Sequence, residues 1–136
     1  MAEGRTYQLE IMTPQKYAYK GEVESIIAEA SDGSFGVLIN HAPMLSALRF
    51  GILRVREVGA AEKIFTVSEG FFEINGNKAA LLVDTCETKE EIDVARARAA
   101  KERAEKRLTQ TEGVDVDRAK AALIRAIMRL KAAGQN

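Results

Sequence analysis

Apolar and polar residues alternate with a period of two in several short runs of the first 87 residues. Residues 7–12 show the pattern, with Tyr7, Leu9 and Ile11 on one face and polar residues between them. Such alternation is typical of a strand that buries one side. Further strands are predicted at residues 23–30, 35–39, 52–58, 63–67, 71–74 and 79–83.

Turn residues separate these runs. Residues 31–34 read Ser-Asp-Gly-Ser, and Asn75-Gly76 is a strong hairpin signal because both residue types tolerate a positive φ. Short strands at roughly ten-residue spacing, with repeated turns and no long helices between them, are typical of a β-sandwich or flattened barrel. The sequence therefore predicts a β-sandwich domain over residues 1–87.

Residues 88–136 predict a different structure, a C-terminal antiparallel α-helical hairpin. They contain eleven alanines and no proline, and alanine is the best helix former. Thr88 and Glu91 can form a capping box that opens the first helix. Asp115 is a candidate N-cap for the second helix, and the chain is expected to fold back around Glu112-Gly113.

The contact between the two helices is predicted to consist largely of alanine. The second helix carries an apolar stripe at heptad spacing, formed by Val116, Ala119, Leu123, Ala126, Leu130 and Ala133 and broadened by Ile127. The first helix offers Ile92, Ala95, Ala99, Ala100, Ala104 and Leu108. Burial of a methylene contributes about 0.8 kcal/mol, so an alanine seam stabilises far less than a leucine seam. We therefore expect a close-packed but marginally stable hairpin, which a ligand can switch.

Three arginines are predicted to converge in this hairpin. Facing residues of the two antiparallel helices have numbers that sum to about 225, because both helices rise equally per residue. Arg96 then faces Arg129, and Arg125 lies about one turn away. Three guanidinium groups repel one another unless an anion or carboxylates neutralise them.

Two arrangements meet this requirement, and residue spacing alone favours the first. In the first, the arginines form ion pairs with Asp93 and with other carboxylates of the helices and the sandwich. In the second, they bind a polyphosphate through charge-assisted hydrogen bonds, with Arg103 on the same face. Glu87 and Asp93 could then accept from the exocyclic amine of a base. Apolar surface for that base would come from Ile92 and Ala97.

The formal net charge is zero, but the two predicted domains differ in sign. Residues 1–87 hold 8 Lys and Arg against 12 Asp and Glu, whereas residues 88–136 hold 12 against 8. The basic hairpin either presents a solvated, salt-bridged face or binds acidic partners. No apolar run approaches the roughly 20 residues of a membrane span. A single cysteine, Cys86, rules out an internal disulfide and is typical of a reducing compartment.

Few residues suit catalysis. His41 is the only histidine, and neither it nor Cys86 belongs to a cluster with metal-ligand spacing. The sequence contains neither a Walker-type phosphate-binding loop nor a G-x-G-x-x-G motif. We therefore predict a non-catalytic protein that requires no metal. Two alternatives are a basic hairpin that binds nucleic acid, although it lacks aromatic residues for stacking, and a cupin-like β-barrel enzyme, although one histidine is too few.

Four segments carry a resemblance to a known family. They are residues 33–45 (Gly-Ser-Phe-Gly-Val-Leu-Ile-Asn-His-Ala-Pro-Met-Leu), residues 65–73 (Phe-Thr-Val-Ser-Glu-Gly-Phe-Phe-Glu), residues 92–97 (Ile-Asp-Val-Ala-Arg-Ala) and residues 100–108 (Ala-Lys-Glu-Arg-Ala-Glu-Lys-Arg-Leu). With these motifs in this order, the chain resembles, over essentially its whole length, the ε subunit of bacterial F-type, proton-translocating ATP synthases.

The resemblance implies a sandwich of about ten strands followed by the helical hairpin, in a non-catalytic subunit of the rotating central stalk. The expected partners are the γ subunit and the c-ring, which bind the sandwich, and the α/β catalytic head. The expected location is the cytoplasmic face of the cell membrane, as a peripheral protein attached through the complex. Ser34, Asn40 and His41 would contact partners.

In the family that the chain resembles, the hairpin either folds against the sandwich or extends along γ. The extended form inhibits ATP hydrolysis, as basic residues of the hairpin meet an acidic segment of the β subunit. In some bacterial members ATP binds the folded hairpin as a regulatory ligand and is not a substrate. The family motif and its neighbours place this expected ATP site at Glu87, Ile92, Asp93, Arg96, Ala97, Arg103, Arg125 and Arg129.

Overall fold

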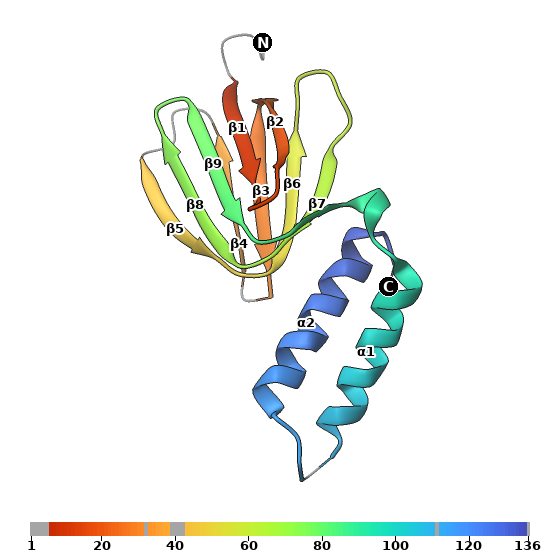
Figure 1. Ribbon diagram of the computed structural model, residues 1–136. Helices are drawn as coiled ribbons and strands as arrows, with labels where there is room; N and C mark the ends of the chain where they lie inside the picture. The colour runs from red at the N-terminus through yellow and green to blue at the C-terminus, as the bar shows by residue number, and fades with distance from the viewer. Residues whose placement is uncertain (1–5, 32, 39–42, 111, 136) are drawn as a thin grey trace.

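The computed structural model describes residues 6–135 except residues 32, 39–42 and 111. In this range the chain forms two five-stranded sheets, one short 3-10 helix and two α-helices (Figure 1). The strands are β1 (Tyr7–Met12), β2 (Tyr17–Val23), β3 (Ser25–Ala30), β4 (Gly33–Leu38), β5 (Met44–Leu48), β6 (Gly51–Arg56), β7 (Lys63–Val67), β8 (Gly70–Asn75), β9 (Lys78–Val83) and β10 (Cys86–Thr88). The helices are η1 (Lys89–Glu91), α1 (Val94–Leu108) and α2 (Val116–Ala132).

The two sheets face each other and form the predicted β-sandwich. Sheet 1 has the strand order β2-β1-β9-β8-β5, and sheet 2 has the order β10-β7-β6-β3-β4. Paired strands are antiparallel except β1 and β9, which run parallel. Every second residue of a strand faces the core, which explains the alternation in the sequence. The most buried core side chains include Leu9, Ile11, Ile26, Leu53, Phe72 and Leu81.

All the predicted strands are present, but the alternation of apolar and polar residues did not predict β2, β5 and β10. Strand β2 contains Gly21 and little alternation, and β10 has only three residues. In β5 the outward residues Leu45 and Ala47 are also apolar, which hides the period of two. The predicted strand at residues 23–30 is divided, because Val23 ends β2 and β3 begins at Ser25.

The predicted hairpin between β8 and β9 is confirmed, but it turns one residue later. Asn75 still pairs with Lys78 in the ladder, so the two-residue turn consists of Gly76 and Asn77. Gly76 has a φ of 63°, a conformation that glycine adopts without steric cost.

The capping box forms as predicted, but it caps η1 and not α1. The Thr88 hydroxyl accepts from the Glu91 N–H at 3.2 Å, and the Glu91 carboxylate accepts from the Thr88 N–H at 2.8 Å. The turn stops at Ile92, whose backbone is extended and whose side chain is buried. The helix α1 then starts anew, with the Asp93 carboxylate accepting from the Arg96 N–H at 3.0 Å. Burial of Ile92 therefore divides the predicted helix start into two.

Alanine dominates the contact between the helices as predicted, but some of the buried positions differ from the predicted ones. Ala97 and Ala104 of α1 are buried, whereas the predicted Ala95 and Ala99 are exposed. In α2 the predicted Ala119, Ala126 and Leu130 are buried, and Asp115 is the N-cap as expected. Val116 and Ile127 are 47% and 42% exposed, so their assignment to the seam was wrong.

The rotation of α2 follows from its second contact, with the sandwich. Helix α2 packs on β6 and β7 of sheet 2 as well as on α1 (Figure 1). Met128 and Ala132 form a buried cluster with Phe50 and Ile52, and Ile92 completes it. The buried residues of α2 must therefore contact both α1 and sheet 2. The heptad spacing in the sequence accounts only for the contact with α1.

The neighbouring phenylalanines of β8 test the assignment of the two faces of sheet 1. Phe72 is buried in the core and Phe71 is exposed. Phe72→Ala is expected to lower the free energy of unfolding by about 3–5 kcal/mol, because it leaves a cavity. Phe71→Ala is expected to change it by less than about 0.5 kcal/mol. Urea denaturation measures both values, and similar losses for the two variants would contradict the assigned register.

Candidate functional site

A cavity of about 400 Å³ lies between α1 and α2, close to where the hairpin meets the sandwich. Its walls come from both helices, from β10 and from the segment that joins β10 to α1. The lining residues are Glu87, Glu91, Asp93, Arg96, Ala97, Ala100, Arg103, Ala122, Arg125, Ala126 and Arg129. Seven of the eight predicted ATP-site residues are among them, and the eighth, Ile92, is not.

The helical repeat explains why these side chains converge. Residues three or four apart lie on one face of a helix, so Arg96 and Arg103 share a row on α1, with Ala100 between them. Arg125 and Arg129 share the facing row on α2. Alanine at the intervening positions leaves room between the long arginine side chains, which explains why this end of the seam is hollow.

Arg129 connects the cavity to the sandwich. Its Nε donates to Oε1 of Glu87 at 2.8 Å, and its guanidinium carbon lies 5.0 Å from the centre of the Phe50 ring. The buried Thr66 hydroxyl donates to the same Glu87 oxygen at 3.1 Å. Each contact is modest alone, since a cation over an aromatic ring contributes about 0.5–1 kcal/mol at a partly exposed site. Together they fix the position of one guanidinium at the edge of the cavity.

The other three arginines of the cavity are not neutralised in this way. Within the described part of the chain, Arg96, Arg103 and Arg125 make no ion pair. The hypothesis of an ion-paired arginine cluster therefore holds for Arg129 and is wrong for these three. Three guanidinium groups remain available as donors around one cavity.

Two nearby carboxylates, those of Glu91 and Asp93, each accept a hydrogen bond from a backbone N–H group. Glu91 belongs to the capping box, and the N–H of Thr88 lowers the pKa of its carboxyl. One oxygen of Asp93 accepts from the Arg96 N–H. The second oxygens of Asp93 and Glu87 make no hydrogen bond to other described residues. They remain available as acceptors at the cavity wall.

Ile92 lies where the sequence did not place it. Its side chain packs with Phe50 and Met128 beneath the hairpin and does not line the cavity. Four further lining residues were not predicted, namely Glu91, Ala100, Ala122 and Ala126. Two of them could have been found from the expectation that facing residues have numbers summing to about 225, since it pairs Ala100 with Arg125 and Ala122 with Arg103.

The predicted partner contacts lie elsewhere. Asn40 and His41 are outside the described residues. Ser34 belongs to β4, the edge strand of sheet 2, where its backbone pairs with Glu29 of β3.

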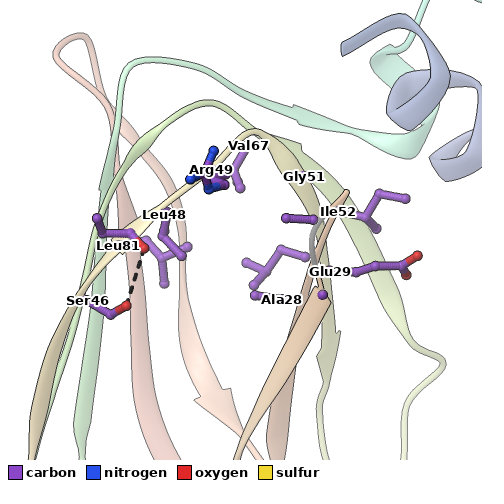
Figure 2. Close-up of a pocket in the computed structure, with 13 residues that line it drawn as sticks. Ala28, Glu29, Ser46, Leu48, Arg49, Gly51, Ile52, Val67 and Leu81 are labelled. Atoms are coloured by element: carbon purple, nitrogen blue, oxygen red, sulfur yellow. Dashed lines mark hydrogen bonds between the residues drawn. The ribbon is translucent and has the colours of Figure 1, made fainter. Parts of the chain in front are cut away.

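A second hollow, of about 290 Å³, lies within the sandwich and is largely apolar. Figure 2 shows Leu48 and Leu81 on one side of it and Ala28 and Ile52 on the other. The Ser46 hydroxyl in its wall donates to the Ala47 carbonyl at 3.3 Å. The described residues that line it include no group of like charges, so the cavity between the helices is the stronger candidate site.

Metal and membrane sites were also sought. Among the residues that the structure describes, no three His, Cys, Asp or Glu side chains are grouped to hold a metal ion. Over the same residues, neither α-helix is long and apolar enough to cross a membrane. Burial raises the pKa of the Cys86 thiol to about 12, aided by the charges of Glu91 and Glu87.

Two family models together match nearly all of the chain. The ATP synthase Delta/Epsilon chain beta-sandwich domain matches residues 6–89, and the ATP synthase Delta/Epsilon chain long alpha-helix domain matches residues 90–134. The chain belongs to the delta/epsilon chain family of ATP synthases. The match confirms the resemblance found in the sequence and gives the nucleic-acid-binding alternative no support.

Relatives agree with this assignment. The ATP synthase epsilon chain of Desulfitobacterium hafniense (strain Y51) is 47% identical over 128 residues, which cover 94% of this chain and 96% of that one. The epsilon chain of Pelotomaculum thermopropionicum is 48% identical, with coverages of 96% and 98%. A chain in the cryo-EM structure of the Euglena gracilis mitochondrial ATP synthase aligns with a TM-score of 0.84, covering 96% of this chain and 82% of that one. At 23% identity, this last likeness shows a shared fold alone.

A second contact ties α2 to sheet 2. The Lys131 ammonium group forms a hydrogen-bonded ion pair with the Glu29 carboxylate of β3, and Arg54 lies 3.6 Å from the same carboxylate. Lys131, together with Arg54, lowers the pKa of the Glu29 carboxyl. A lowered pKa in the folded state means that this contact stabilises docking above pH about 4.5 and is lost as the pH falls through the lowered pKa.

The titration of Glu29 tests the docked position of α2. In the wild-type protein its carboxyl is expected to titrate below the ordinary value of 4.5, and Lys131→Met is expected to raise its pKa toward that value. Carboxyl chemical shifts measured by NMR across the acid range give the pKa. The pKa of Glu91 serves as an internal control and should stay the same in the variant. An unchanged pKa of Glu29 would mean that Lys131 does not hold α2 against β3.

Proposed function

We propose that the protein is a non-catalytic central-stalk subunit of an ATP synthase whose helical hairpin binds ATP as a regulatory ligand. The observation that supports this most directly is the cavity between α1 and α2, where Arg96, Arg103 and Arg125 converge and none of the described carboxylates pairs with them. Family membership supports the subunit assignment independently of the ligand.

A nucleoside triphosphate suits the chemistry of this cavity. Its phosphate oxygens accept charge-assisted hydrogen bonds from guanidinium groups, which also form bidentate pairs. The carboxylate oxygens of Glu87 and Asp93 that have no hydrogen-bond donor among the described residues can accept from the exocyclic amine of adenine. Alanines supply apolar wall. The cavity volume of about 400 Å³ lies within the usual range for small-molecule sites.

ATP in this position would stabilise the compact hairpin. Its phosphates would bridge Arg96 and Arg103 of α1 to Arg125 and Arg129 of α2, so the site exists only while the helices lie side by side. A ligand shifts a two-state equilibrium only through such a difference in affinity. At a hundred times its dissociation constant, ATP would add about 2.7 kcal/mol to the compact form. This free energy is large compared with the stabilisation that a seam of alanines provides.

The partners follow from the proposed position in the stalk. The sandwich would bind the γ subunit and the c-ring at the cytoplasmic face of the cell membrane, with Ser34, Asn40 and His41 among the contacts. The hairpin, when extended, would inhibit ATP hydrolysis as its basic residues meet the acidic segment of the catalytic β subunit. The excess of Lys and Arg over Asp and Glu in residues 88–136 supports this charge complementarity.

Calorimetry tests the ligand directly. Titration of ATP into the full-length protein should release heat, and Arg96→Ala should weaken binding about tenfold to a hundredfold, because a hydrogen bond to a charged group contributes about 1.5–3 kcal/mol. Arg107→Ala is the matched control, since Arg107 lies on the same helix and does not line the cavity. Absence of heat at millimolar ATP would remove the nucleotide proposal and leave the family assignment intact.

Hydrolysis assays test the regulatory part. With the catalytic head and γ subunit, added wild-type protein should inhibit ATP hydrolysis less as ATP rises, because ATP favours the compact form. Arg96→Ala should inhibit more strongly than wild type at the same ATP concentration, since its compact form loses the ligand. The measured quantity is the ratio of hydrolysis rates with and without the protein at each ATP concentration. Equal ratios for both proteins would contradict regulation through this cavity.

A further inference from the structure

Among the residues that the structure describes, Thr66 of β7 is the only polar aliphatic side chain that is buried, at 1% exposure. The register of sheet 2 places it directly opposite Ile52 of β6 on one side and Glu87 of β10 on the other. A hydroxyl group that is removed from water costs free energy unless it forms a hydrogen bond. Valine has nearly the same shape and is equally common in strands, so packing and strand preference alone do not explain a threonine at this position.

The hydroxyl of Thr66 is bonded to a charged group at the edge of the nucleotide site. It donates to Oε1 of Glu87 at 3.1 Å, and Nε of Arg129 donates to the same oxygen at 2.8 Å. Hydrogen bonds to an ionised acceptor are stronger than bonds between neutral groups. Oε1 of Glu87 therefore has one donor from the interior of sheet 2 and one donor from α2.

These two bonds also restrict the other oxygen of the same carboxylate. A carboxylate group is planar and rigid, so the position of Oε1 limits where Oε2 can lie. Oε2 of Glu87 has no donor among the described residues, and Glu87 lines the cavity between the helices. Glutamate is one of the side chains that lose most rotamer freedom when they are fixed. Because Thr66 restricts Glu87 before a ligand arrives, less entropy is lost when a ligand binds to it.

An ionised carboxylate oxygen accepts hydrogen bonds and donates none. In the proposed site its donor is the exocyclic amine of adenine. A base without this amine would leave Oε2 of Glu87, whose side chain is 33% exposed, without a partner. Sites that are built to bond a donor of the substrate reject analogues that lack it, because a partly buried polar group then remains unpaired.

A purely structural role of Thr66 makes a different prediction from a role in recognition. If the hydroxyl only held β10 in place or supported the docking of α2 through Arg129, its loss would weaken the binding of every nucleoside triphosphate equally. If it positions Glu87 toward the base, its loss changes the ratio of the affinities for two ligands that differ only in the exocyclic amine.

We propose that Thr66 is a positioning residue of the nucleotide site and that it determines, through Glu87, the preference for a base with an exocyclic amine. This inference rests on the proposed function and names the part of the ligand that the sandwich recognises. The arginines of the cavity belong to the hairpin, whereas Thr66 and Glu87 belong to sheet 2. Recognition of the base therefore requires that the hairpin is docked on the sandwich.

Calorimetry with two ligands tests this role on the full-length protein. The ligands are ATP and purine riboside triphosphate, which lacks only the exocyclic amine, and the measured quantity is the ratio of their dissociation constants. The wild-type protein should bind ATP more tightly. Thr66→Val keeps the shape and removes the hydroxyl, and it should reduce the ratio about twofold to tenfold, the usual cost of ordering one long side chain on binding.

Two further variants show whether the hydroxyl is responsible. Thr66→Ser keeps the hydroxyl and should retain the wild-type ratio. Thr85→Val is the matched control, because Thr85 is exposed and does not line the cavity, and it should also retain the ratio. Thermal melting confirms that each variant is folded.

A double-mutant cycle shows whether Thr66 acts through Glu87. Glu87→Ala should bring the ratio close to one. Addition of Thr66→Val to this variant should leave the ratio unchanged, because the side chain that Thr66 positions is then absent. A change of the ratio in the Glu87→Ala background would contradict the inference.

Three other results would overturn it as well. They are a wild-type ratio close to one, a wild-type ratio retained by Thr66→Val, and an equal loss in Thr66→Ser and Thr66→Val. In each of these cases ATP still binds to the wild-type protein, so the proposed function stands. Absence of binding of both triphosphates to the wild-type protein would instead overturn the proposed function, and this inference with it.

Discussion

The contact of Arg129 with Glu87 and Phe50 connects helix α2, the β-sandwich and the cavity between the helices, and the arrangement of these three parts depends on it. Arg129 belongs to α2, Glu87 to the end of the sandwich, and the same guanidinium group stands at the edge of the cavity that faces Arg96. Thr66 holds Glu87 from within the sheet. A helix of modest apolar content thus acquires a defined position on sheet 2, next to the apolar contact of Met128 and Ala132 with Phe50. The same contact fixes the position of one of the four arginines at the cavity.

The magnitudes explain how such an assembly can respond to a ligand. A partly exposed ion pair contributes about 0.2–1 kcal/mol, and a cation over an aromatic ring a similar amount. The alanine seam adds less per residue than leucine would. An anion that binds only the compact form adds about 2.7 kcal/mol at a hundred times its dissociation constant. The free energy added by the ligand is therefore comparable to that of the contacts that hold α2. The sandwich core around Phe72 and Leu9 does not take part in this equilibrium. Under the proposal, ATP changes the hairpin and leaves the sandwich as it is.

The sequence predicts the sandwich and the hairpin because alternation and alanine content are local signals. It also brings Arg96, Arg125 and Arg129 together, since the helical repeat and equal rise determine which residues face. What it misses arises from long-range contacts. Ile92 leaves the cavity because Phe50 and Met128 bury it, and that burial moves the helix start from Thr88 to Asp93. Ile127 and Val116 are exposed because α2 turns its stripe toward two neighbours. The strand at Met44–Leu48 was not predicted because its outward residues Leu45 and Ala47 are also apolar.

Hydrogen exchange of the full-length protein, followed by mass spectrometry with and without ATP, tests the central claim most directly. The account predicts that ATP slows exchange of backbone amides in α1 and α2, because the ligand stabilises the helices against each other and against sheet 2. Exchange in the core strands β8 and β9 should stay the same, and Arg96→Ala should abolish the slowing. If ATP leaves exchange in both helices unchanged, or slows it only in the sandwich, the cavity does not couple ATP to the hairpin.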